Sequence, residues 1–421
     1  MVKSLRTVAF AAICSLVIGG YAGTEAYAAD PAVKREMRSA WVATVWQLDW
    51  PQSTVSSTGN TTQINAQKKQ LTTLLDSLAR NNMNSICFQV RSRSDAMYKS
   101  SYEPWSSDLV SSRGLDPGYD PLAYCIEECH KRGMECHAWI NPYRYESQIG
   151  QCNGTPKAYR DEHPDWLLDV KEASILNPAL PEVRQRICDV VDEIVRNYDV
   201  DGVLFDDYFY LQGISTEDAA HYQSYKQGGG TLPLGDWRRD NVNKMVADVY
   251  STIKKAKPYV RFGISPAGVA ATSASVAGKY GLSPFPAGSD WQYNGIYSDP
   301  LAWVSSRTLD FISPQIYWKI GSSADYDAIC KWWSDAANKF GRHFFSSQGV
   351  AYNYGEEEYA KQVRLNRKYT LNAAPGSVFY SAKYLYRTTT PLLGHYLKTQ
   401  VFNTPALIPA MTWFPVSSPA K

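Results

Sequence analysis

Two adjacent acids, Asp206 and Asp207, end a short apolar run near the middle of the chain. The turn-forming pair Asp201-Gly202 precedes this run, so Gly202–Tyr208 is predicted to be a short strand. Two neighbouring buried acids cost free energy unless they have a purpose, and carboxyl groups at a strand end suit acid–base or nucleophilic chemistry on a glycosidic bond. We therefore expect both acids to be catalytic, with Asp206 meeting the substrate. The alternative is a structural salt bridge.

A further carboxyl group is expected from a different part of the chain. Glycosidases commonly place two carboxyl groups about 5 Å apart for retention, or about 6.5–9.5 Å apart for inversion. Neighbouring side chains on a regular strand point to opposite faces, so Asp207 is a poor partner for Asp206 across a sugar. Asp95, four residues after Arg91, is the preferred second catalytic acid. Weaker candidates are Glu103, Asp290 and Asp299.

Neutral, basic and aromatic side chains at other predicted strand ends complete the expected substrate-binding site. They are Arg91, His137, Trp139, Asn141, Arg144, Asn177, Tyr208, Gln315, Tyr317 and Trp318. Arg91 is expected to pair with Asp206 or Asp207 and to hold that carboxylate ionised. His137 either binds sugar hydroxyls or orients a carboxylate, or it is a satisfied histidine inside the fold.

Eight β-rich runs alternate with helical segments, and this alternation predicts the elements that position the site. The predicted strands are Ser39–Trp46, Ser85–Arg91, Glu135–Pro142, Gly202–Tyr208, Arg261–Gly268, Phe311–Trp318, His343–Ala351 and Gly376–Leu385. Helices are predicted at Asn65–Asn81, Asp120–Arg132, Pro181–Tyr198, Asp236–Lys257 and Glu356–Leu371, among others. Eight such units predict an α/β fold, a closed (β/α)8 barrel forming a single domain with long βα loops and its site at the strand C-termini.

The two ends of the chain differ from this pattern. Lys3 and Arg6 precede an apolar run too short to span a bilayer, and Ala26-Tyr27-Ala28 offers a cleavage pattern. Residues 1–28 are therefore predicted to be a signal peptide, residues 29–400 the barrel, and residues 401–421 a Pro-rich tail that is loosely packed or disordered. The protein is expected to be secreted across the inner membrane and to be periplasmic or extracellular, without a transmembrane segment.

Composition narrows the choice of partners. The formal net charge of +2 argues against nucleic acid or an anionic membrane, whereas 13 Trp, 29 Tyr and 13 Phe suit stacking on sugar rings as well as a large core. No metal or cofactor is expected, because a ligand set of Cys125, Cys129, Cys136 and His137 would need a helix and a strand to converge. A disulfide involving Cys152 remains open, and at least one of the seven cysteines of the mature chain must be free or paired between chains.

Ten ordered sequence blocks carry a family resemblance that covers about Arg38 to Leu385. They are Ser39–Val45, Leu48–Pro51, Phe88–Arg91, Asp95–Tyr98, Glu103–Ser106, Pro117–Leu122, His137–Arg144, Phe205–Tyr210, Gly263–Pro266 and Pro314–Trp318. With these blocks the chain resembles the glycosyl-hydrolase-like 10 family of bacterial envelope proteins. The loop Val269–Tyr297 departs from the expected pattern.

The resemblance implies a TIM-barrel glycosidase, and one divisome-associated branch looks like an enzyme that cuts peptidoglycan strands stripped of their stem peptides. It supports as site positions Asp206, Asp207, Arg91, Asp95, His137, Asn141, Arg144, Gln315 and Tyr317.

Our leading hypothesis is hydrolysis of a bacterial glycan, such as denuded peptidoglycan, by carboxyl groups without a cofactor. A partnership with the cell envelope or the divisome would follow from that substrate. Three alternatives remain: a dietary or host polysaccharide as substrate, a catalytically dead glycan-binding barrel, and a metal-dependent deacetylase or amidase. The last needs a His/Asp ligand cluster, which six scattered histidines do not suggest.

Overall fold

The computed structural model describes residues 30–270, 273–289, 291–370, 374–386 and 393–414. The predicted signal peptide lies outside these residues. Within them, no helix combines the length and the apolar character needed to cross a bilayer.

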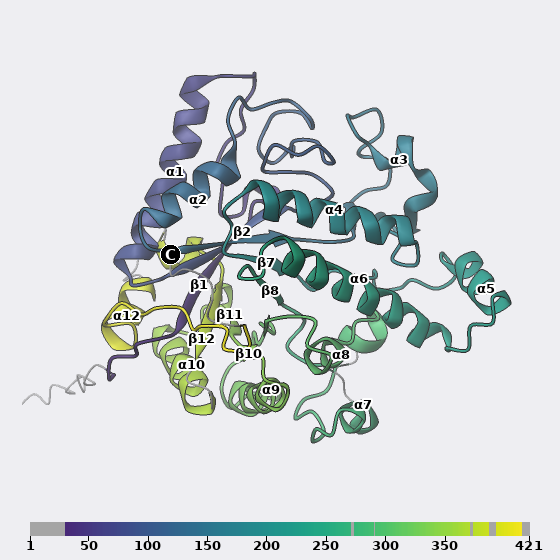
Figure 1. The fold of residues 1–421 in the computed structure, drawn as a ribbon. Coiled ribbons are helices and arrows are strands. Elements are labelled where there is room, and N and C mark those ends of the chain that lie inside the picture. Colours follow the sequence, from purple (N-terminus) through teal and green to yellow (C-terminus); the bar gives the residue numbers. More distant parts are fainter. Residues whose placement is uncertain (1–29, 271–272, 290, 371–373, 387–392, 415–421) are drawn as a thin grey trace, which may run out of the picture.

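One parallel sheet forms the centre of the molecule, with helices packed around it (Figure 1). Its strands are β1 (Met37–Val42), β2 (Ser85–Arg91), β3 (Glu135–Ile140), β7 (Gly202–Phe205), β8 (Arg261–Ile264), β9 (Phe311–Ile312), β10 (His343–Phe344), β11 (Ser346–Gly349) and β12 (Gly376–Tyr380). Their order is β10-β9-β8-β7-β3-β2-β1-β12-β11. β10 and β11 flank the single residue Phe345, and they pair with β9 and β12 respectively, so together they are the seventh of eight barrel positions. The predicted (β/α)8 barrel is confirmed.

The helices follow the strands in the expected alternation. They are α1 (Thr61–Arg80), α2 (Pro121–His130), α3 (Tyr159–Glu162), α4 (Pro181–Asn197), α5 (Ala219–Gln227), α6 (Leu234–Ala256), α7 (Ala274–Lys279), α8 (Pro300–Ser305), α9 (Tyr326–Phe340), α10 (Glu356–Tyr369), α11 (Lys383–Tyr386) and α12 (Leu393–Gln400). Short turns of other helix types are η1 (Val45–Gln47), η2 (Pro164–Trp166), η3 (Trp291–Gly295) and η4 (Val350–Tyr352). α4 shows the local logic: Pro181 begins it, Glu182 lies in its first turn, and its apolar stripe is buried.

The long third βα loop contains a small antiparallel sheet that the sequence did not reveal. Its strands are β4 (Arg144–Glu146), β5 (Leu167–Val170) and β6 (Ala173–Leu176), in the order β4-β6-β5. This sheet gives the loop a rigid backbone directly beside the strand ends of the barrel.

Several barrel strands end earlier than predicted. β8 stops at Ile264 and β9 at Ile312, two residues before Pro266 and Pro314 respectively. Proline lacks the N–H that a ladder requires, so the polar residues that follow each strand belong to the loops. These early ends free the side chains at the carboxyl end of the barrel from strict alternation.

The barrel interior is filled by an apolar cluster of its own. Its members are Met37, Trp41, Ala43, Cys87, Trp139, Leu204, Phe311, Phe345 and Val378. Gly263 on β8 leaves room for this packing, since a Cβ atom there would lie 2.1 Å from the Phe311 ring. β8, the fifth barrel strand, therefore has a glycine at this position, because the Phe311 ring of the neighbouring strand β9 fills the space that a side chain would take.

The chain after α12 packs more firmly than predicted. Residues 401–414 run along the end of the barrel where the strands begin. The Glu36 N–H donates to the Leu407 carbonyl at 2.8 Å, and the Arg261 guanidinium donates to the Pro409 carbonyl at 2.7 Å. The expectation of a loose tail is wrong for this stretch, because its carbonyls satisfy donors of the barrel. Residues 415–421 lie outside the described chain.

Prediction for the barrel interior: Gly263→Ala will lower the free energy of unfolding by about 1–3 kcal/mol, the usual cost of overpacking a filled core. Gly278→Ala is the matched control, because a Cβ atom on that α7 residue would meet nothing within 4 Å. Urea unfolding of the two variants checks this. Equal midpoints for both would contradict the described packing of Phe311.

Candidate active site

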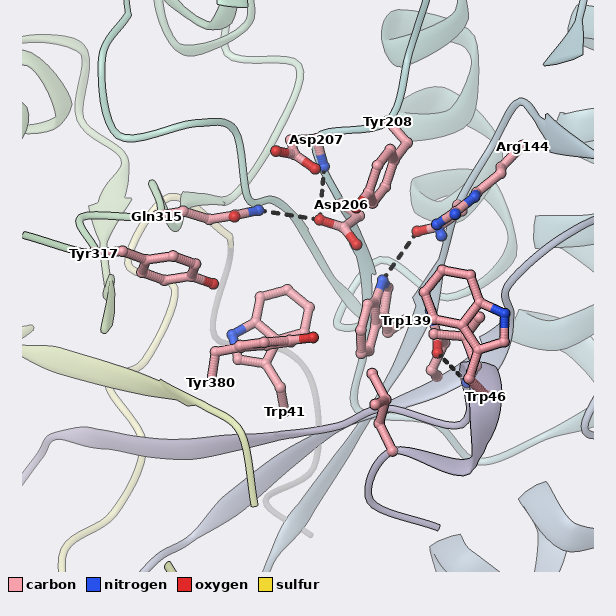
Figure 2. A pocket seen from close by; sticks show the side chains of 14 residues that line it. Trp41, Trp46, Trp139, Arg144, Asp206, Asp207, Tyr208, Gln315, Tyr317 and Tyr380 are labelled. Carbon is pink, nitrogen blue, oxygen red and sulfur yellow. Dashed lines mark hydrogen bonds between the residues drawn. The ribbon is translucent and has the colours of Figure 1, made fainter. Parts of the chain in front are cut away.

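Asp206 and Asp207 lie immediately after β7 and both line one pocket at the carboxyl end of the barrel (Figure 2). The strand ends at Phe205 and the chain bends at Asp207, so strict alternation no longer applies. The two acids were expected to share a face only if the strand were irregular at this point; it ends before them, and both line the pocket. Asp206 is 7% exposed, and Asp207 is half-buried.

The two acids form one hydrogen-bonded unit. The Asp207 N–H donates to Asp206 Oδ1 at 2.8 Å, and Gln315 Nε2 donates to the same oxygen at 3.1 Å. The Asp207 carboxyl group lies near enough to Asp206 and Gln315 for both to influence its pKa. Gln315 is oriented by the Ser265 carbonyl, to which its Nε2 donates at 3.1 Å.

Burial and mutual repulsion keep a proton on this pair. Burial raises the pKa of Asp206, against the hydrogen bonds from Asp207 and Gln315 and the positive charge of Arg144. Burial, and then the charge of Asp206, raise the pKa of Asp207 well above its ordinary value. Two carboxyl groups so close cannot both ionise easily, and the larger rise in pKa at Asp207 makes it the member of the pair that holds a proton more strongly.

Aromatic rings form much of the pocket wall. The pocket encloses about 680 Å³, and its lining is Trp41, Val45, Trp46, Leu48, Gln89, Trp139, Asn141, Arg144, Asp206, Asp207, Tyr208, Gln315, Tyr317 and Tyr380. Trp41 and Trp139 meet edge to face with ring centroids 4.7 Å apart, and Figure 2 shows them beneath Asp206. Sugars present apolar C–H faces that stack on such rings while their hydroxyls bind polar groups.

Arg144 places a positive charge in this pocket. Its guanidinium lies 4.6 Å from the Tyr208 ring centroid and 5.5 Å from the Trp46 ring centroid. Among the described residues no carboxylate forms an ion pair with Arg144. A cation held between aromatic rings and free of an acidic partner can bind an anionic group of a ligand.

Trp46 projects from the loop after β1 and is 58% exposed. Its backbone φ is +53°, a left-handed conformation that bulky residues rarely adopt. The Trp46 N–H donates to Asp108 Oδ1 at 3.1 Å, and Gln47 Nε2 donates to the Asp108 carbonyl at 3.0 Å. The loop thus holds a large exposed ring at the pocket edge despite backbone strain, as binding sites often do.

A second cavity of about 620 Å³ adjoins the first and shares its wall of Trp46, Arg144 and Tyr208. The small antiparallel sheet lines its other side through residues such as Glu146 and Ile175. Through these shared residues the two cavities adjoin one another.

Three charged residues named from the sequence lie elsewhere. Arg91 forms a buried ion pair with Glu103 at 2.7 Å, not with Asp206 or Asp207, because the second βα loop folds back over the end of β2. Asp95 does not line the pocket. Its carboxylate is buried and accepts the backbone N–H groups of Ser92 and Arg93 at 3.1 and 2.9 Å, so it shapes the loop.

The remaining weak candidates for a second acid are also accounted for. Asp299 caps α8 by accepting the Ala302 N–H and receives the Tyr280 hydroxyl at 2.7 Å, so its carboxylate has a structural role. Asp290 lies outside the described residues.

Three further residues predicted to bind substrate do not line the pocket. His137 is fully buried inside the barrel, with Nε2 2.9 Å from a Glu135 carboxylate oxygen, because its position on β3 lies well below the strand end. Asn177 is buried and receives the Ala179 N–H at 3.0 Å. Trp318 packs against the core beside Gly268.

The other predicted binding residues do meet in the pocket, namely Trp139, Asn141, Arg144, Tyr208, Gln315 and Tyr317. Sequence reasoning missed Trp41, Val45, Trp46, Leu48, Gln89 and Tyr380. Trp46 carried a usable signal, since it is an aromatic residue at the carboxyl end of the predicted strand Ser39–Trp46. Trp41 and Tyr380 carried less, because both lie inside predicted strands and only the observed strand ends show that they reach the pocket.

A cluster of thiols is the one group of potential metal ligands found among the described residues. The sulfur atoms of Cys125, Cys129 and Cys136 lie within 4.8 Å of one another, buried between α2 and β3. The expectation that the helix and the strand would not bring these cysteines together is wrong, because β3 follows α2 closely and turns back beneath it. His137, the next residue on β3, points into the barrel instead. The thiols are remote from the acid pair, and all seven described cysteines are free and buried, including Cys152.

Comparison with known proteins agrees with this geometry. Residues 36–353 match the family described as Glycosyl hydrolase-like 10. The chain is 37% identical over 428 residues to "Glycosyl hydrolase YngK" of Bacillus subtilis (strain 168), covering 97% of this chain and 80% of the relative. It is 35% identical over 414 residues to "Glycosyl hydrolase DigH" of Escherichia coli (strain K12), covering 90% of each.

Solved structures with little sequence similarity share the fold. The glycoside hydrolase domain of PgaB (BpsB) from Bordetella bronchiseptica matches with a TM-score of 0.56 at 10% identity, covering 88% of this chain and 99% of that domain. The catalytic domain of β-amylase from Paenibacillus polymyxa matches with a TM-score of 0.55 at 11% identity, with the same coverage.

Fold, acid pair and aromatic cleft define a (β/α)8-barrel glycoside hydrolase. Within that class, the chain belongs to the Glycosyl hydrolase-like 10 family.

Prediction for the acid pair: Asp207→Asn will stabilise the protein at neutral pH. A carboxyl group whose pKa is raised by folding stabilises the fold below its unfolded-state pKa, and this contribution is lost as pH rises through the folded-state pKa. The Asp207→Asn variant has no ionisable group at this position, so it does not lose this stability as the pH rises. Its Tm should therefore exceed that of the wild type at neutral pH. The difference should vanish below about pH 3.9, the ordinary pKa of aspartic acid.

Calorimetry across this pH range provides the measurement. Asp335→Asn is the control, because that exposed α9 residue only pairs with Lys331. Its effect should stay within about 0.5 kcal/mol at every pH. A lower Tm for Asp207→Asn at neutral pH would contradict the described burial and repulsion of the pair.

Proposed function

We propose that this glycoside hydrolase cleaves bacterial glycan strands, and specifically peptidoglycan strands that have lost their stem peptides. The observation that carries the proposal is the unpaired Arg144 guanidinium beside the Asp206–Asp207 pair in one aromatic pocket. Removal of a stem peptide leaves a free lactyl carboxylate on each muramic acid residue. Arg144 is suited to that anion, whereas an intact peptide would present a bulky amide there instead.

The shape of the cleft supports a polymeric substrate. The adjoining cavities share Trp46, Arg144 and Tyr208, so a strand can continue past the acids on to a second binding region. In this arrangement Arg144 lies at the boundary between the two, where it can bind a substituent of the sugar next to the cleavage point. Trp46 and Tyr208, both exposed, offer stacking surfaces on either side of that boundary.

The proposed substrate indicates the compartment in which the protein would act. Peptidoglycan lies outside the inner membrane, so we propose that the segment 1–28 directs secretion and that the mature protein works in the periplasm or outside the cell. Association with the division apparatus would follow if stripped strands form mainly where septal wall is split.

Prediction for activity: purified mature protein will release fragments from amidase-stripped peptidoglycan strands and not from unstripped strands, as measured by mass spectrometry. Asp206→Asn and Asp207→Asn will each lower kcat/KM by at least about 100-fold, the scale of lost acid–base catalysis. Asp335→Asn should match the wild type. Release of fragments from both substrates would show that cleavage does not require prior removal of the stem peptides. No fragments from either would favour another polysaccharide or a glycan-binding barrel, which a glycan array would test.

Prediction for substrate charge: Arg144→Gln will raise KM for stripped strands by about tenfold, the effect of losing one charge-assisted hydrogen bond of about 1.4 kcal/mol. On strands whose lactyl carboxylates have been converted to amides, wild type and variant should have similar KM values. Arg113→Gln is a control, because Arg113 binds the Ser94 carbonyl away from the pocket lining. If Arg144→Gln raised KM equally for both substrates, Arg144 would not bind the lactyl carboxylate.

A further inference from the structure

The two acids of the pocket lie on one side of any bound sugar. They are consecutive residues, joined by a hydrogen bond from the Asp207 N–H to the Asp206 carboxylate, and both line the same pocket, so they cannot flank a glycosidic bond from opposite faces. The other described residues that line this pocket carry no carboxyl group; in the adjoining cavity Glu146 is ion-paired with Arg160 at 2.8 Å and Glu172 is exposed. A double displacement by a protein nucleophile needs a carboxylate on the face opposite the leaving group, and a single displacement needs a base there to activate water. The described pocket supplies neither.

Carboxyl groups near neighbouring strand ends already have partners within the protein. Asp49 is fully buried, and its carboxylate accepts the Ala43 and Lys383 N–H groups at 2.9 and 2.8 Å and the Ser381 hydroxyl at 2.8 Å. Glu103 is used by Arg91. Moving either one into the pocket would break a buried network, which costs several kcal/mol.

We propose that the substrate supplies the missing nucleophile: the carbonyl oxygen of a 2-acetamido group attacks the anomeric carbon of its own sugar, with Asp207 as acid and Asp206 as the group that binds the acetamide N–H. The inference rests on the proposed function and narrows it to glycans whose cleaved residue is an N-acetylated amino sugar.

The first step is balanced by groups in the pocket. The acetamido oxygen forms a bond to C1 as the C1–oxygen bond to the leaving sugar breaks, and Asp207 transfers its proton to that leaving oxygen. The resulting oxazolinium ion is stabilised by the Asp206 carboxylate. In the second step a water molecule gives a proton to Asp207 and attacks C1. This step reopens the ring, restores the acetamido group, and retains the anomeric configuration after two inversions.

The surroundings of the two acids match these different roles. Asp206 is the more buried and is held in place by the Asp207 N–H and the Gln315 amide, as a fixed carboxylate should be. Asp207 is half-buried, which leaves it able to reach a leaving group and then a water molecule.

The pocket floor offers a place for the acetyl methyl group. The indole N–H groups of Trp41 and Trp139 are already used, by Ser347 Oγ at 3.0 Å and Asn141 Oδ1 at 3.1 Å. The faces left to the pocket are therefore apolar. Tyr380 packs against the apolar cluster that contains Trp41 and Trp139, and all three rings line the pocket. An apolar hollow next to a fixed carboxylate fits a methyl amide better than a bare hydroxyl.

The test compares the same stripped strands carrying different N-acyl groups. Strands are de-N-acetylated and then re-N-acylated with acetyl or trifluoroacetyl groups, and kcat/KM is measured from new reducing ends with full-length mature protein. Fluorine withdraws electrons from the carbonyl oxygen, so participation predicts at least a tenfold loss, about 1.4 kcal/mol in barrier. Similar rates for the two strands, or a product of inverted configuration by NMR, would overturn the inference while the proposed function stands. Failure to cleave even the acetyl strands would overturn both.

A second measurement separates the two acids. On an aryl glycoside of an N-acetylated disaccharide with a 2,4-dinitrophenyl leaving group, protonation is not needed. Asp207→Asn should then regain most of its lost rate, whereas Asp206→Asn should stay impaired. Equal impairment of both variants on this substrate would contradict the assigned roles. Calorimetry of each variant at low pH verifies that both are folded.

Discussion

Closure of the parallel sheet is the constraint on which the rest of this molecule depends. A strand at the edge of a sheet has backbone N–H and C=O groups without hydrogen-bond partners. This sheet has no free edge, because β10 pairs with β9, β11 pairs with β12, and only Phe345 separates β10 from β11. Because the strands are parallel, all their carboxyl ends lie on one side, and closure brings these ends together in a ring. Residues as distant in sequence as Trp41, Asp206 and Tyr380 therefore meet in one pocket.

Packing inside the barrel decides what the pocket floor is made of. The interior is filled by large rings such as Trp41, Trp139 and Phe311, and the first two of these reach the base of the pocket. Their indole N–H groups are satisfied from the side, so their apolar faces are what a ligand meets. The same rings exclude water from below Asp206, and this desolvation holds a proton on the pair. Burying this pair thus reduces stability at the point where we propose acid catalysis.

Buried ion pairs organise the long loops around the cleft. Arg91–Glu103 lies under the second βα loop, and Arg238–Asp218 under the fourth, each with both side chains almost fully buried. Removing one partner of a buried ion pair strongly destabilises a protein, whereas the intact pair adds little net stability. These pairs therefore serve mainly to fix the geometry of the loops. Asp95 has a similar task through backbone N–H groups. Charged residues near strand ends therefore divide into those that build loops and those that face the substrate.

Local sequence patterns by themselves determined the alternation of strands and helices, the barrel that follows from it, and the position of Asp206 and Asp207 at the end of the fourth barrel strand. These features depend on periodicity, turn residues and the position of polar groups after apolar runs, all of which are local. Only the tertiary structure decided that both acids face one pocket, that Arg91 serves Glu103, and that His137 is enclosed. The reason is physical: a carboxylate or guanidinium takes whichever partner the folded loops bring within about 3 Å, and sequence distance does not encode that choice.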